Sequence, residues 1–235
     1  MIIVFVIIIL LAVIYWLFMS PFSQVFGGYP WRVATKDKVI ALTFDDGPNE
    51  PYTSEIADYL AEKKIKATFF QVGECINRYP ETTKRLHQDG HVIGNHSVHH
   101  RFLDYFVHPT YRQEIVDNQK IITDLIGVQP ALFRSPWLWR QPALLRTLRQ
   151  LNIQPVSGEF CHELEVFQPS GQSIAKRTLA KIKPGSIIIF HDGFDAKGGN
   201  RTQTVTAVKI TIDELINLGY RFVTISELLQ VPAYQ

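Results

Sequence analysis

The sequence has few cysteines, no long run of basic residues and no charged side chain between Met1 and Trp31. With only Cys75 and Cys161, far apart along 235 residues, it has neither a disulfide-dense scaffold nor a CxxC-type metal site. We expect two buried free thiols, with one disulfide as the alternative. The 24 Lys and Arg residues nearly balance the 22 Asp and Glu residues, and their scatter along the chain excludes a nucleic-acid surface built from clustered cations.

The uncharged N-terminus predicts a membrane anchor over residues 1–26. Residues 2–18 are apolar almost throughout, and at about 1.5 Å per helical residue they only just span a hydrocarbon core of roughly 30 Å, so residues 19–26 are included. A cleaved signal peptide is the rival, but no Lys or Arg precedes the run and no A-x-A-like site follows it. A buried core helix is the third possibility. We expect a linker over residues 27–37 and one catalytic domain over residues 38–235.

The domain alternates between two kinds of apolar pattern. Strand-like runs occur at residues 39–44, 67–72, 91–94, 131–133, 153–156, 186–190 and 221–225. Helical patterns, with apolar residues at intervals of three and four, occur at residues 51–64, 80–88, 111–126, 142–151, 173–182 and 202–218. Strands that alternate with helices imply right-handed crossovers and a parallel sheet. Seven strands therefore indicate an α/β fold with a closed or nearly closed barrel.

In such barrels the chemistry gathers at the carboxyl ends of the strands. Polar residues follow four of the strand-like runs directly, and these are Asp45 with Asp46, His96, Arg134 and His191. Their shared position predicts that they lie at one end of the barrel and form one site.

His96 and His100 indicate a metal site. They lie four residues apart, which is one helical turn, so both imidazoles can face a single ion. Two histidines with one carboxylate make a facial site that leaves positions open for water and substrate. Neighbouring residues at a strand end point to opposite sides, so one of Asp45 and Asp46 can bind the metal while the other acts as a base. The residues alone do not decide between them, and a histidine-rich surface is the alternative.

Hydrolysis at such a site also needs an acid for the leaving group. His191 ends the run at residues 186–190 and is placed to donate a proton, with a hydrogen-bonded core histidine as the alternative. Arg134 can hold a carboxylate through a bidentate pair. Trp137 offers a wall on which a sugar ring or an acyl methyl group can pack.

Four motifs, in this order, resemble those of the polysaccharide deacetylase family, carbohydrate esterase family 4. They are Thr43-Phe44-Asp45-Asp46-Gly47-Pro48, His96-Ser97-x-x-His100, Arg134-x-Pro136-Trp137 and Ile189-x-His191. Residues 199–205 and 219–224 also look like that family, and the resemblance covers residues 38–229. It implies a distorted (β/α) barrel of about seven strands. The implied reaction is hydrolysis of N-acetyl groups on a glycan, with a divalent metal, usually zinc, as cofactor.

The resemblance, rather than the spacing, assigns a role to each matching position. Three side chains bind the metal, namely Asp46, His96 and His100. Three have catalytic roles, with Asp45 as the general base, Arg134 holding it and His191 as the general acid. Three are expected to bind the substrate, with Trp137 and Ile189 lining the acyl pocket beside Pro136.

One part of the chain departs from the family. Family members commonly carry an Asp, often followed by Trp, before the strand that ends at the acid histidine, and this Asp tunes that histidine. Residues 141–191 contain neither residue type. Glu159, Glu163 and Glu165 are candidates to replace the Asp, and Trp139 is a candidate for the missing aromatic wall. The sequence does not choose among them.

We therefore expect a metal-dependent hydrolase that removes N-acetyl groups from amino sugars of peptidoglycan or a chitin-like glycan, acting on carbon–nitrogen but not peptide bonds. The alternatives are a deformylase or deacylase of a lipid-linked sugar and a catalytically silent glycan-binding homologue. The expected partners are the glycan and the membrane, with no nucleic acid and no obligate protein partner. Arg32, Lys36 and Lys38 favour a cytoplasmic domain. Because an envelope glycan lies outside the cytoplasm, we nevertheless expect a single-pass protein with its domain on the extracytoplasmic side.

Overall fold

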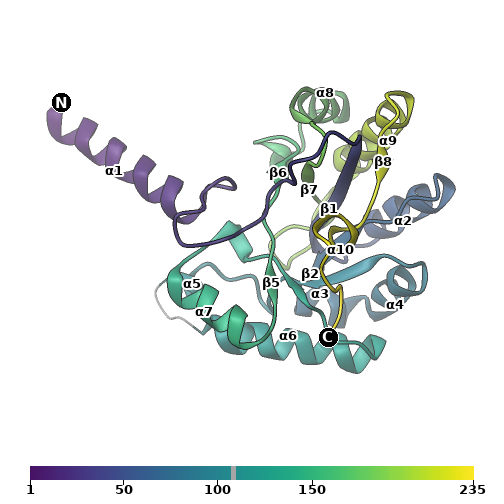
Figure 1. Ribbon diagram of the computed structural model, residues 1–235, viewed down its shortest axis with the longest axis horizontal. Coiled ribbons are helices and arrows are strands. Elements are labelled where there is room, and N and C mark those ends of the chain that lie inside the picture. The colour runs from purple at the N-terminus through teal and green to yellow at the C-terminus, as the bar shows by residue number, and fades with distance from the viewer. Residues whose placement is uncertain (107–109) are drawn as a thin grey trace.

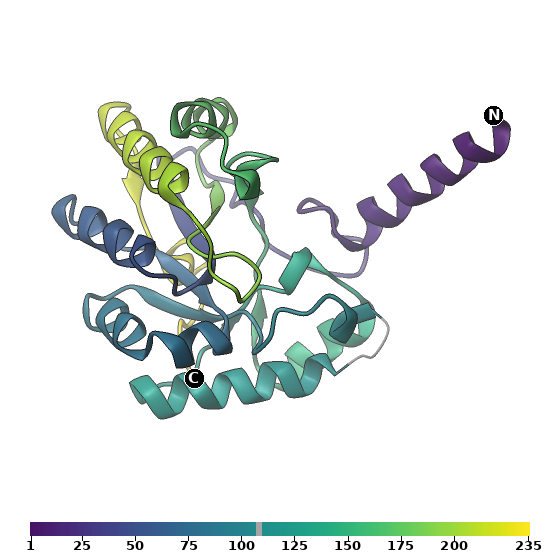
Figure 2. The same cartoon turned by 180° about the vertical axis from the view of Figure 1, so that it is seen from behind.

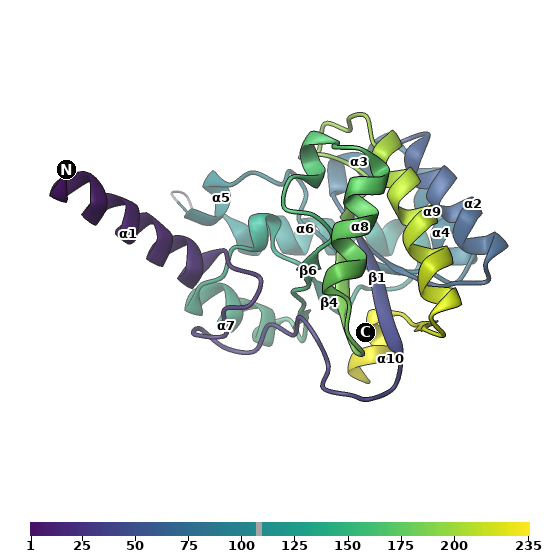
Figure 3. The same cartoon turned by 90° about the horizontal axis from the view of Figure 1, so that it is seen from above.

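The computed structural model describes residues 1–106 and 110–235. Helix α1 (Ile2–Phe18) projects from one side of an α/β domain that contains the other helices and strands (Figures 1 and 3). The strands are β1 (Val39–Gly47), β2 (Thr68–Gln71), β3 (Val92–Asn95), β4 (Leu132–Phe133), β5 (Gln154–Pro155), β6 (Glu159–Phe160), β7 (Ile187–His191) and β8 (Arg221–Phe222).

The sheet is parallel, in the order β5-β4-β3-β2-β1-β7-β6, and β8 pairs with the start of β1. Since β5 and β6 are the two ends of this order, the sheet forms an open, distorted (β/α) barrel. Each of the seven strand-like runs overlaps a strand, and only the two-residue β6 was not predicted. The parallel α/β fold is therefore confirmed.

The helices of the domain are α2 (Tyr52–Glu62), α3 (Gly73–Arg78), α4 (Pro80–Gln88), α5 (Leu103–Phe106), α6 (Tyr111–Ile126), α7 (Pro142–Gln150), α8 (Gly171–Lys181), α9 (Thr202–Asn217) and α10 (Ile225–Leu229). Most of them cover the outer face of the sheet, whereas Ile225 of α10 packs on the opposite face with Ala41 and Ile187. Figure 2 shows α8, α9, α2 and α4 following one another around the outside, and each packs against the next. The six predicted helices are present, whereas α3, α5 and α10 were not predicted.

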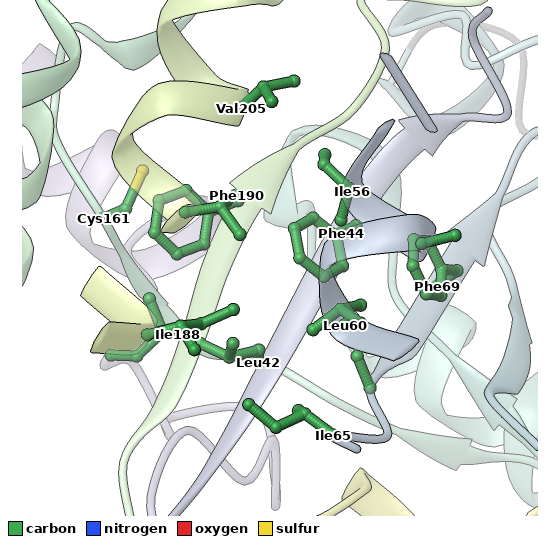
Figure 4. Packing of buried hydrophobic residues seen from close by; sticks show 14 of the residues in the cluster. Leu42, Phe44, Ile56, Leu60, Ile65, Phe69, Cys161, Ile188, Phe190 and Val205 are labelled. Atoms are coloured by element: carbon green, nitrogen blue, oxygen red, sulfur yellow. The ribbon is translucent and has the colours of Figure 1, made fainter. Parts of the chain in front are cut away.

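The main core lies between β1, β2 and β7 on one side and α2 and α9 on the other (Figure 4). Leu42 and Phe44 of β1 pack there beside Phe190 of β7. Since side chains alternate along a strand, Thr43 and Asp45 point to the opposite face. Burial of one such Phe or Leu contributes about 1.5–3 kcal/mol, so this core fixes the register of β1 and with it the position of Asp45. Both cysteines are buried free thiols, as expected.

The predicted transmembrane anchor and the single-pass membrane localisation are wrong. The helix ends at Phe18, well before residue 26. Pro21 lies shortly after the helix end, and the chain turns there. Its 17 residues rise only about 26 Å, which is short of a hydrocarbon core of roughly 30 Å. Among the helices of the described ranges, none is both long enough and apolar enough to cross a membrane.

Candidate active site

Asp45 and Asp46 lie at the carboxyl end of β1, and Asp45 pairs in register with His191 of β7. In a regular strand two adjacent carboxylates would point to opposite faces, yet both line the same cavity. The reason is local. The β1–β2 ladder is irregular between Asp45 and Gly47, and Asp46 has a left-handed φ of 72°. This bulge turns Asp46 toward the cavity that Asp45 already faces.

Asp46, His96 and His100 form a buried cluster whose potential ligand atoms all lie within 4.8 Å of one another. Asp46 Oδ1 is 3.3 Å from His96 Nε2 and 3.1 Å from His100 Nε2. Although buried, this oxygen accepts no hydrogen bond. Burial alone would raise the pKa of Asp46, but the adjacent His100 and His96 imidazoles hold it well below its ordinary value. A buried carboxylate facing two imidazole nitrogens fits a divalent cation such as zinc.

The Nδ1 atoms of His96 and His100 are hydrogen-bonded to other parts of the protein. His96 Nδ1 donates to the Arg134 carbonyl oxygen at 2.7 Å, and His100 Nδ1 donates to Asp195 Oδ1 at 3.1 Å. With Nδ1 as the donor, Nε2 is the ring nitrogen that faces Asp46 and is available to a metal. The backbone N–H of Asp195 also donates to Asp46 Oδ2 at 3.1 Å. Asp195 therefore positions two members of the cluster, and sequence reasoning missed it because it belongs to no strand-end motif.

The segment from His96 to His100 is a loop rather than the helical turn that the four-residue spacing suggested. Ser97 and His100 have left-handed φ values of 68° and 57°. Glu114 of α6 shapes this loop, because its Oε2 accepts backbone hydrogen bonds from Val98 at 3.1 Å and His99 at 2.9 Å. The two imidazoles thus converge as predicted, but for a different geometric reason.

Arg134 is fully buried behind Asp45. Its Nη1 donates to Asp45 Oδ1 at 2.6 Å and to Thr43 Oγ1 at 2.7 Å, and its Nη2 donates to the Ser157 carbonyl oxygen at 2.9 Å. The contact with Asp45 is therefore made by one nitrogen rather than by the expected bidentate pair. The arrangement fixes the Asp45 carboxylate and leaves its other oxygen free of the guanidinium.

His191 is paired with Glu165, one of the three candidates for the missing Asp. Its Nδ1 lies 2.8 Å from Glu165 Oε2, and Thr204 Oγ1 donates to the other carboxylate oxygen of Glu165. Burial alone would lower the pKa of His191, but the buried Glu165 carboxylate outweighs burial and raises it to about 9. Glu163 instead contacts Lys181 at 2.8 Å. The pairing leaves Nε2 of His191 for the cavity.

A cavity of about 240 Å³ lies in front of these groups. Among the residues that line it are the predicted Asp45, Asp46, His96, His100, Trp137 and His191, together with Tyr15, Met19, Phe160 and Phe194, which were not predicted. Pro136 and Ile189 are buried and do not line it. Trp139 is buried and stacks on Phe18 at 5.1 Å, whereas the ring of Phe160 lies parallel to His191 at 6.2 Å. Phe160 thus provides the aromatic face beside His191.

Comparison with known proteins decides the family. The model of the polysaccharide deacetylase family matches residues 32–156. The chain belongs to the polysaccharide deacetylase family. A peptidoglycan-N-acetylglucosamine deacetylase of Bacillus cereus is 35% identical over 205 residues, which cover 87% of this chain and 94% of that protein. A chitooligosaccharide deacetylase of Azorhizobium caulinodans is 29% identical over 82% of this chain and 95% of that protein. The chain is thus a hydrolase of this family.

Solved structures agree with this assignment. The crystal structure of the Bc1960 peptidoglycan N-acetylglucosamine deacetylase aligns with a TM-score of 0.81 and 30% identity, over 88% of this chain and 95% of that one. BA3943 of Bacillus anthracis, a pseudoenzyme of carbohydrate esterase family 4, aligns with a TM-score of 0.76 at 20% identity, over 86% of this chain and 69% of that one. At that identity the second match shows a shared fold alone.

Proposed function

We propose that this deacetylase hydrolyses the N-acetyl group of N-acetylglucosamine units in a cell-envelope glycan such as peptidoglycan or a chitin-like polymer, and that it depends on a divalent metal. One observation carries the proposal, which is that a metal-ligand cluster, a held carboxylate and a carboxylate-paired histidine line one cavity. Relatives that are named for deacetylating peptidoglycan and chitooligosaccharides support this substrate class.

The metal would be held by Asp46, His96 and His100, and zinc suits this set of two imidazoles and one carboxylate. When bound, it would supply Lewis-acid polarisation of the acetyl carbonyl group. The protein's own contribution is to keep the ligands in place through Asp195 and the carbonyl oxygen of Arg134.

Asp45 acts as the general base. The Arg134 guanidinium holds one of its oxygens, and the free oxygen accepts a proton from the attacking water. The water oxygen then forms a bond to the acetyl carbon. Since Arg134 is fully buried and is held by Thr43 and Ser157 as well, the carboxylate does not need to reorganise during this step.

His191 acts as the general acid. An amine is a poor leaving group until its nitrogen is protonated, and Glu165 keeps a proton on His191 at neutral pH. Transfer of that proton to the sugar nitrogen accompanies cleavage of the carbon–nitrogen bond. The products are acetate and the free amino sugar, and the proton taken by Asp45 replaces the one lost by His191. The silent-homologue alternative rested on the missing Asp, and the presence of Glu165 weakens it.

The proposal is tested with the full 235-residue chain loaded with zinc. Acetate release is measured on chitooligosaccharides and on peptidoglycan. Asp45→Asn should lower kcat by about 10²–10⁴-fold, because the water loses its base, while the zinc content measured by elemental analysis stays the same.

Asp37→Asn is the matched control, since Asp37 is exposed and does not line the cavity. It should leave both readouts unchanged. If the zinc-loaded parent releases no acetate from either substrate, the proposal is wrong. Release of formate from a lipid-linked formamido sugar would then favour the deformylase alternative.

A further inference from the structure

The end of α1 reaches the active site. Tyr15, in the last turn of this helix, and Met19, directly after it, line the same cavity as Asp45 and His191. Neither residue belongs to the metal-ligand cluster or to the acid–base groups described above. They nevertheless add one aromatic and one aliphatic side chain to a cavity that already contains Trp137 and Phe160. Figures 1 and 3 show the end of α1 meeting the part of the domain that contains α7, while the start of the helix points away. The short helix η1 (Pro136–Leu138) precedes α7 in the chain.

The position of this helix end is fixed by contacts with the residues that directly follow η1. The backbone N–H of Arg140 donates to the Phe18 carbonyl oxygen at 2.9 Å, and Arg140 Nη1 donates to the Ser23 carbonyl oxygen at 2.5 Å. The ring of Phe18 stacks on Trp139 at 5.1 Å. Arg140 and Ser23 are both almost fully buried. Tyr15 and Met19 are therefore held in place rather than attached by a free tether.

Ser157 connects this N-terminal segment to the predicted base. Its Oγ donates to the Pro21 carbonyl oxygen at 2.8 Å, and its N–H donates to the Pro30 carbonyl oxygen at 2.8 Å. Its own carbonyl oxygen accepts from Arg134, which holds Asp45. A single buried serine thus contacts both the N-terminal segment and the guanidinium of the catalytic machinery.

The N-terminal contribution precedes the part of the chain that the family model matches, which begins at residue 32. Because neither Tyr15 nor Met19 belongs to the metal-ligand cluster or to the acid–base groups, such a wall is suited to set the specificity of this chain. Tyr15 has an apolar ring with a polar hydroxyl group, and such rings pack against surfaces that are apolar on one side and wet on the other. The apolar face of a pyranose ring is a surface of this kind.

We propose that Tyr15 and Met19 form a binding wall for the sugar next to the one that is deacetylated, an inference that rests on the proposed function. The occupant is thus an oligosaccharide of at least two N-acetylglucosamine units. The acetylated sugar faces Asp45 and His191, and its neighbour packs against Tyr15. The N-terminal segment then contributes to binding of the oligomer, while the catalytic groups hydrolyse the acetylated unit.

The test compares Tyr15→Ala and Tyr15→Phe with the parent on N-acetylglucosamine and on its tetramer. Loss of one aromatic contact should raise KM for the tetramer about fivefold, with kcat, KM for the monomer and zinc content unchanged. Tyr15→Phe should retain most of the tetramer affinity. Trp16→Ala is the control, because Tyr15 and Trp16 are both 52% exposed on the same helix and Trp16 does not line the cavity.

Calorimetric titration of the tetramer into zinc-loaded Asp45→Asn, with and without Tyr15→Ala, separates this inference from the proposed function because it needs no turnover. A weaker tetramer affinity with Tyr15→Ala supports the wall even if the parent proves inactive. An unchanged tetramer affinity, or an equal change for Trp16→Ala, overturns it.

Discussion

His96, His100 and His191 all line the cavity, and each has its Nδ1 engaged by the protein, which decides what its Nε2 can do. The partner of His96 is a backbone carbonyl oxygen, whereas His100 and His191 have carboxylates. For His96 and His100 the free Nε2 faces Asp46 and suits a metal. For His191 the Glu165 carboxylate stabilises the doubly protonated ring, which suits an acid.

Glu165→Gln tests the pairing with His191. The folded pKa of about 9 lies above the ordinary value of 6.5, so His191 is protonated through the neutral range and loses its proton as the pH rises through about 9. Without the carboxylate, burial favours the neutral ring. We expect the alkaline limb of the kcat profile to move to lower pH by roughly one pH unit or more, and NMR titration of His191 in the metal-free protein to move in the same direction.

Glu163→Gln is the matched control, since Glu163 lines the same cavity but contacts Lys181. The alkaline limb of its kcat–pH profile should coincide with that of the parent. An unshifted limb and an unshifted His191 titration in Glu165→Gln would contradict the assignment of Glu165.

At the scale of elements, the loop after β7 passes so close to the end of β1 that only glycine fits. A Cβ added at Gly193 would lie 2.1 Å from the carbonyl oxygen of Asp46, which is backbone and cannot rotate away. We expect Gly193→Ala to lower the free energy of unfolding by about 1–3 kcal/mol, because the loop and the strand must separate. We also expect it to weaken zinc binding, because the displaced residue is a predicted ligand.

Urea unfolding and competition with a chromophoric chelator measure the two effects. Gly28→Ala is the control, since a Cβ at Gly28 meets no atom within 4 Å. Equal stability and equal zinc affinity in the two variants would show that the loop and the strand are not coupled.

The longer elements could be predicted from the sequence, because burial on one or both faces imposes a period on apolar residues. The two-residue β6 and the short α3, α5 and α10 are too brief to show a period. The strand-end rule found Asp46, His96 and Arg134, since their position depends on the parallel sheet, and the spacing from His96 added His100. It did not find Asp195, whose role depends on loop contacts between distant parts of the chain. Glu165 could be named only as one of three candidates for the same reason.

Two errors had local causes. The four-residue spacing of His96 and His100 suggested a helix, but left-handed backbone at Ser97 and His100 brings the imidazoles together from a loop. The anchor was predicted from composition, whereas the length of α1 depends on where the chain turns, just before Pro21.

At the scale of the whole molecule, the predicted metal site joins parts of the chain that are far apart. Its ligands come from β1 and from the loop after β3, and their supports come from the β4 end and from Asp195. Binding to this folded arrangement stabilises it by mass action. At a free zinc concentration of 100 times Kd the gain is about 2.7 kcal/mol, which raises Tm by roughly 5–10 °C for a domain of this size.

Calorimetry with zinc and with excess chelator measures this difference in Tm. Asp46→Asn removes one ligand charge and should reduce the zinc-dependent part of Tm. If zinc raised Tm equally in the parent and in Asp46→Asn, the assigned ligands would be wrong.

The long-range pairing of β1 also has a consequence for biosynthesis. Thr43 is hydrogen-bonded to Ile188, 145 positions later, and Asp45 acquires its neighbour His191 on that same strand. Thr204, which supports Glu165, comes later still. At roughly 5–20 residues per second a ribosome needs about 7–30 s to cover the 145 positions between Thr43 and Ile188. The predicted catalytic centre therefore cannot assemble on a nascent chain that has not reached α9.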